Sequence, residues 1–98
     1  MDLNIYDIPT ERLEEKVMAD LVKNALYAVR SDNSELVYEC LGQANMARAL
    51  GAIKFETLRN IEHALINGYL NAGGGQRKEY ARKITAEDIR QGRNWRDK

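Results

Sequence analysis

Residue types that could do metal chemistry are few in this chain of 98 residues. It has one histidine, His63, and one cysteine, Cys40, whereas a metal site needs several ligands at set spacing. Neither residue stands in a His-x-x-x-His or Cys-x-x-Cys pattern. Glu62 directly precedes His63, whereas the Glu-x-x-His motif of di-metal helical bundles separates the two by two residues. We therefore expect no metal and no cofactor, a structural or solvent-facing His63, and a Cys40 that behaves as a small hydrophobic residue.

Two other patterns could suggest catalysis. Acidic residues cluster near the N-terminus at Glu11, Glu14 and Glu15. Carboxylates there are favoured by the dipole of a helix that begins at this point, which explains them without acid–base chemistry. The glycines at 73–75, followed by Arg77 and Lys78, lack the preceding strand and the Gly-Lys-Ser/Thr ending of a phosphate-binding loop. The sequence predicts a flexible hinge there, no catalytic residues and no enzyme, since an enzyme would need a site shared between two protomers.

Basic and aromatic residues gather near the C-terminus. The basic residues are Arg77, Lys78, Arg82, Lys83, Arg90, Arg93, Arg96 and Lys98, and Tyr80 and Trp95 lie among them. Such a mixture can bind phosphates and stack on bases. Arginine, tyrosine and tryptophan are equally the residue types enriched at protein interfaces. A solvated tail is the plainest alternative, and four acidic residues in the same segment weaken the case for nucleic acid.

The elements that must position these residues are helices. Apolar residues recur at steps of three and four from Leu13 to Val29, from Leu36 to Ala47 and from Leu58 to Ala72. This spacing places each set on one side of an α-helix. The predicted helices span about 10–30, 34–50, 54–72 and 85–92. The last one opens with Thr85 and Asp88 in the spacing of a capping box.

The sequence therefore predicts an all-α fold, a small bundle of three main helices plus a short C-terminal helix after the glycine-rich hinge. Residues 1–75 form the predicted helical core domain, with an N-terminal arm over 1–8. Residues 76–98 form a basic C-terminal helix and tail, which we expect to be a mobile fourth element. Gly51 is expected to take the left-handed conformation after the second helix.

Composition limits the partners and the cellular compartment that we expect for the protein. The formal net charge is zero, which gives no whole-molecule attraction to nucleic acid or membrane. The charge is unevenly spread, because residues 1–40 hold nine acids and four bases while residues 76–98 hold four acids and eight bases. These opposite halves, with the wide apolar stripe of the first helix, favour a homodimer. Neither a signal peptide nor an apolar run long enough to span a bilayer is visible, so we expect a cytoplasmic protein.

A resemblance to a known family lies in the second helix and the residues after it. In Leu41–Gly51, Gln43 is followed by a small Ala47 four residues later and then by Leu50-Gly51. This order resembles the helix-turn-helix of the Cro/repressor family. The resemblance implies a DNA-binding transcriptional regulator that uses 43–62, with contacts from Gln43, Lys54, Arg59, Arg77 and Lys78. Arg59-Asn60-Ile61-Glu62 resembles the end of that family's recognition helix. The segment departs from the family because one residue too many separates Gly51 from Ile61-Glu62, and because Phe55 and Glu56 stand where phosphates would lie.

Aromatic residues outside the apolar stripes favour a different function. Tyr27 and Tyr38 fall away from the main stripes of their helices, and Trp95 stands close to the C-terminus. Rings in such places indicate contact surface beyond a minimal core. The sequence predicts a non-enzymatic interaction protein, an adaptor, inhibitor or regulatory subunit that binds a protein partner stoichiometrically. The expected partner-binding residues are Tyr27, Tyr38, Tyr80, Arg90, Arg93, Trp95 and Arg96. DNA binding by the 43–62 segment is the alternative.

Overall fold

The computed structural model describes residues 10–72, 79 and 81–94, and these residues are mostly helical with no strand among them. The elements in chain order are α1 (Thr10–Arg30), α2 (Ser34–Ala49), α3 (Phe55–Glu62), the π-helical segment η2 (His63–Leu70) and α5 (Ala86–Gln91). The segment η2 continues α3 without a break. The prediction of an all-α helical bundle with a short C-terminal helix is confirmed.

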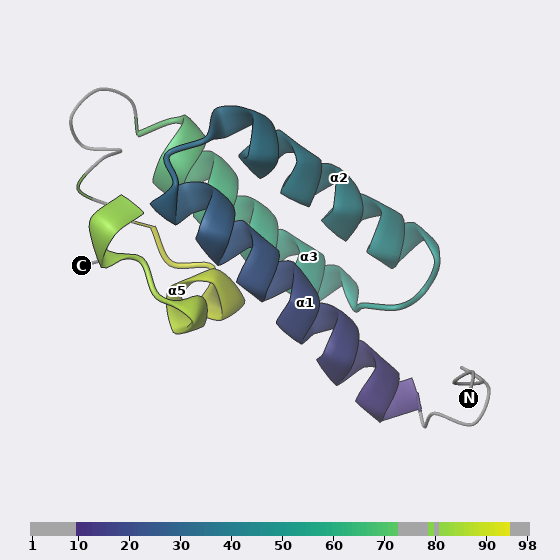
Figure 1. The fold of residues 1–98 in the computed structure, drawn as a ribbon. Coiled ribbons are helices and arrows are strands. Elements are labelled where there is room, and N and C mark those ends of the chain that lie inside the picture. The colour runs from purple at the N-terminus through teal and green to yellow at the C-terminus, as the bar shows by residue number, and fades with distance from the viewer. Residues whose placement is uncertain (1–9, 73–78, 80, 95–98) are drawn as a thin grey trace, which may run out of the picture.

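The three long helices alternate in direction and lie side by side (Figure 1). Helix α2 packs against α1 and α3, and α5 packs against α1, α3 and η2. In Figure 1, α5 lies on the side of α1 and α3 that is turned away from α2. Helices α2 and α5 therefore lie on different sides of the bundle.

Turn and cap residues set the helix boundaries. Asp32 takes a left-handed conformation with φ of 50° between α1 and α2, and the Asn33 side chain accepts a hydrogen bond of 3.2 Å from the Leu36 backbone N–H. Gly51 has φ of 76° in the turn that leads to α3, as the sequence predicts. The predicted capping box of α5 is also present, because the Thr85 and Asp88 side chains each accept a hydrogen bond from the other residue's backbone.

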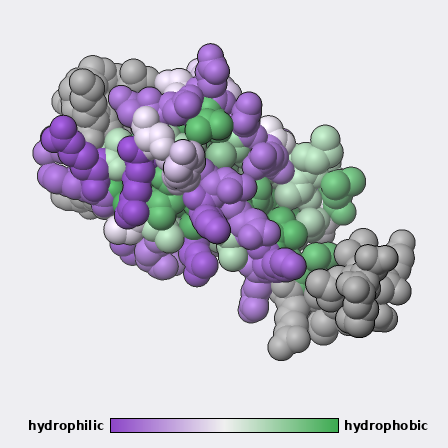
Figure 2. All heavy atoms as spheres, viewed as in Figure 1, coloured by the Kyte–Doolittle hydropathy of each residue, from purple (hydrophilic) through white to green (hydrophobic). Residues whose placement is uncertain are grey.

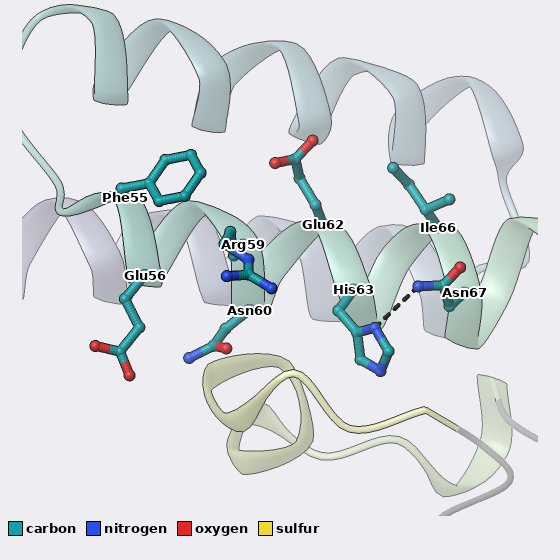
Figure 3. Close-up of a pocket in the computed structure, with 8 residues that line it drawn as sticks. All are labelled: Phe55, Glu56, Arg59, Asn60, Glu62, His63, Ile66 and Asn67. Carbon is teal, nitrogen blue, oxygen red and sulfur yellow. Dashed lines mark hydrogen bonds between the residues drawn. The ribbon is translucent and has the colours of Figure 1, made fainter.

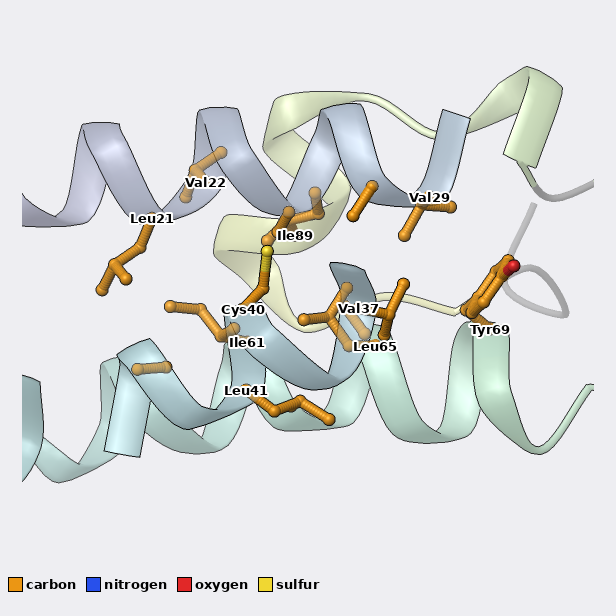
Figure 4. Close-up of a cluster of buried hydrophobic side chains, with 14 of the residues drawn as sticks. Leu21, Val22, Val29, Val37, Cys40, Leu41, Ile61, Leu65, Tyr69 and Ile89 are labelled. Atoms are coloured by element: carbon orange, nitrogen blue, oxygen red, sulfur yellow. The ribbon is translucent and has the colours of Figure 1, made fainter. Parts of the chain in front are cut away.

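A single cluster of buried apolar side chains fills the space between the helices (Figure 4). The largest fully buried side chains belong to Tyr69, Ile61, Leu65, Ile84, Ile89, Val22, Val29 and Val37. Most of them lie on the predicted stripes. The period of the apolar residues in the sequence thus correctly identifies the inward face of each long helix.

The segment after the glycines belongs to the same core. Ala81, Ile84 and Ile89 are buried within the common cluster, and the guanidinium of Arg30 donates a hydrogen bond of 3.0 Å to the Ile84 carbonyl. The expectation of a mobile fourth element beside a three-helix core is wrong for these residues. Their apolar side chains are buried in the common cluster, and burying them is favourable.

The second half of the third helix differs from the expectation of a uniform α-helix. From His63 onward the backbone is π-helical, and the Asn71 N–H bonds to the Ile66 carbonyl, five residues earlier, at 2.7 Å. The Tyr69 ring is fully buried, and its hydroxyl donates a hydrogen bond to the carboxylate of Asp32. This contact joins the end of η2 to the α1–α2 turn.

Several predicted features lie outside the described residues: the arm over 1–8, the hinge at 73–75, and Arg77, Lys78, Tyr80, Trp95 and Arg96. Within the described part of the chain, no helix combines the length and the apolar character needed to cross a membrane.

Candidate interaction surface

Helix α2 has apolar residues on both of its sides, and on the outer side they stand among exposed polar residues such as Glu35 and Glu39. Val37, Cys40, Leu41 and Ala44 form its buried side. On the outer side, Tyr38 is 62% exposed, Met46 is 60% exposed and, just after the helix, Leu50 is 76% exposed. Gly42 is exposed between them. We call Tyr38, Gly42, Met46 and Leu50 the outer ridge, because a spacing of four residues aligns them in one row along a helix.

An apolar groove runs beside the outer ridge, between α2 and α1. It has a volume of about 540 Å³ and is lined by Val17, Leu21, Gly42, Gln43, Met46, Ala47, Leu50 and Ala52. Only the Gln43 side chain brings a polar group into this lining. Figure 2 shows hydrophobic residues gathered at the end of the molecule where α2 leads into α3. Three residues of the outer ridge, Gly42, Met46 and Leu50, also line this groove, and Tyr38 stands further along the same row. We call the groove together with the ridge the α1–α2 face.

A second, smaller groove continues the α1–α2 face toward the other end of α2. Its volume is about 230 Å³, and its lining consists of Asn24, Tyr27, Leu36, Glu39, Cys40 and Gln43. Burial, and secondly the negative charge of Glu39, raises the pKa of the Cys40 thiol. The thiol therefore stays protonated at neutral pH and is a poor nucleophile. Here the surface offers a tyrosine ring, which is 67% exposed, and polar side chains suited to binding.

The outer side of α3 and η2 carries a more polar groove of about 760 Å³, lined by Phe55, Glu56, Arg59, Asn60, Glu62, His63, Ile66 and Asn67. Figure 3 shows these side chains on the outside of the helix between α2 and α5. The Arg59 guanidinium lies 6.0 Å from the centre of the Phe55 ring. The His63 ring and the Asn67 amide form a hydrogen bond of 2.9 Å. His63 faces solvent. The sequence predicts either a structural or a solvent-facing histidine at this position.

The α3 groove lacks the arrangement that metal or nucleophilic chemistry needs. Its ionisable groups are two glutamates, one arginine and one histidine, and no cysteine or serine stands beside the histidine. Among the described residues, no group of three or more histidine, cysteine, aspartate and glutamate side chains is placed to hold a metal ion.

The structure separates the predicted partner-binding residues. Tyr27 and Tyr38 are exposed, as their positions off the stripes predict. Arg90 and Arg93 are also exposed, but they lie in and just after α5, on the other side of the bundle from α2 (Figure 1). Arg93 forms an ion pair of 3.9 Å with the buried carboxylate of Asp88. These arginines and the two tyrosines therefore cannot contact one small partner surface together.

The residues of the DNA-binding alternative are also divided. Gln43 lies in the middle of a continuous α2, whereas the Cro/repressor resemblance requires a short helix that begins there. Helices α2 and α3 run antiparallel side by side (Figure 1), whereas a helix-turn-helix crosses at about 90–120°. Gln43 lines the α1–α2 grooves, while Arg59 lines the α3 groove and Lys54 stands at the N-cap position of α3 without a side-chain cap hydrogen bond. DNA binding by these residues stays a prediction, without the geometry that the resemblance implies.

Sequence reasoning missed most of the outer ridge. Met46, Leu50 and Phe55 are exposed large hydrophobic residues that were not among the expected contact residues. The signal was present, since Tyr38, Gly42, Met46 and Leu50 stand four residues apart. A second apolar row on a helix that already has a buried stripe is what could have revealed it.

No protein-family model, curated protein or solved structure matches this chain.

Proposed function

We propose that this protein is a non-enzymatic helical interaction protein that acts by stoichiometric binding of a protein partner through the α1–α2 face. The observation that carries the proposal is the exposure of Tyr38, Met46 and Leu50 on the outer side of a helix whose inner side is already buried. Contiguous exposed apolar patches commonly mark interaction sites.

The energy available at this surface supports the proposal. Fully burying one large apolar side chain stabilises by about 1.5–3 kcal/mol. Tyr38, Met46 and Leu50 are 62%, 60% and 76% exposed. Covering the exposed two-thirds of these three side chains is therefore worth roughly 3–6 kcal/mol. The adjacent groove, with Val17, Leu21 and Ala47 in its lining, adds further apolar area next to them.

A charge placed on the outer ridge tests the proposal. The Met46→Glu substitution should leave the fold intact, because the side chain is 60% exposed, and should abolish partner binding, because a carboxylate would be buried without a counter-ion. The matched control is Phe55→Glu, which changes a residue that is 58% exposed but lies in the α3 groove. Far-UV circular dichroism and thermal unfolding check the fold of both variants.

The measurement is cross-linking of the full chain in the cells that produce it, followed by determination of the mass ratio of the linked chains. We expect a complex of fixed stoichiometry that forms with the unmodified chain and with Phe55→Glu but is lost with Met46→Glu. Reassembly from purified components then has to give the same ratio. A complex that survives Met46→Glu, or no complex of fixed stoichiometry, would overturn the proposal.

A further inference from the structure

We draw no further inference here: the strongest candidate, the apolar groove between α1 and α2 with the outer ridge beside it, carries nothing because nothing in the structure shows what covers it.

Discussion

Gly92 offers the sharpest test of how the C-terminal segment joins the core. It follows α5 with φ of 71°, and a Cβ at this position would lie 3.0 Å from the Cα of Asn60 and 3.2 Å from its carbonyl oxygen. Gly51 has nearly the same backbone conformation, with φ of 76°, but its added Cβ would meet nothing within 4 Å. The two glycines therefore differ in their surroundings and not in their backbone conformation.

The expected magnitudes follow from this difference. An alanine in the left-handed region costs about 1–2 kcal/mol at either position. At Gly92 the methyl group also presses on the backbone of α3, which cannot rotate away as a side chain does, and overpacking of this kind costs about 1–3 kcal/mol more. Gly92→Ala should therefore destabilise the fold by about 2–5 kcal/mol, and Gly51→Ala by about 1–2 kcal/mol.

Urea unfolding of both variants, followed by circular dichroism, measures the difference. Equal slopes with different midpoints would show that the variants change stability and not the amount of structure that unfolds. The excess for Gly92→Ala over Gly51→Ala reports the packing of the turn after α5 on Asn60. Equal losses in the two variants would refute the conclusion that this segment is packed into the core.

Two further predictions concern buried side chains. Tyr69→Phe keeps the ring but removes the hydroxyl that donates to Asp32, so it should lower the free energy of unfolding by about 1–2 kcal/mol in urea denaturation; no loss would mean that this contact does not hold η2 to the α1–α2 turn. Burial raises the pKa of the Cys40 thiol, so the unfolded chain loses this proton at lower pH than the folded chain does. The free energy of unfolding should therefore fall as pH rises into the alkaline range, and this fall should be absent in Cys40→Ala. If the free energy of unfolding depends on pH in the same way in the unmodified chain and in Cys40→Ala, the prediction is wrong.

The fold was largely predictable because its signals are local. The predicted helix over 10–30 matches Thr10–Arg30, and the predicted helix over 34–50 matches Ser34–Ala49 to one residue. Asn33, Gly51 and Thr85 act at the helix ends through their own side chains or backbone. Capping and left-handed turns depend on a few neighbouring residues, so they can be read from the sequence without the tertiary structure.

Packing of the C-terminal segment was not predictable in the same way. Ala81 lies in a helical stretch, Ile84 lies in a break, and Ile89 lies in α5. Apolar residues divided over a break show no single period, so the pattern did not indicate burial. The change of α3 to a π-helical backbone at His63 likewise has no local signal. Packing of the C-terminal segment depends on contacts between segments far apart in the chain, such as the hydrogen bond from Arg30 to the Ile84 carbonyl.

The outer surface of α2 has a local signal in the sequence, but its exposure depends on the tertiary structure. Its inner stripe satisfied the expectation of one buried face, so the remaining apolar residues looked like ordinary surface positions, which are common singly. Only the structure shows that Tyr38, Met46 and Leu50 are exposed on one helix, beside an apolar groove. Gly42 stands in the lining of the same groove, and a Cβ added there would meet nothing within 4 Å, so neither its backbone nor its packing in the protomer marked this position in the sequence.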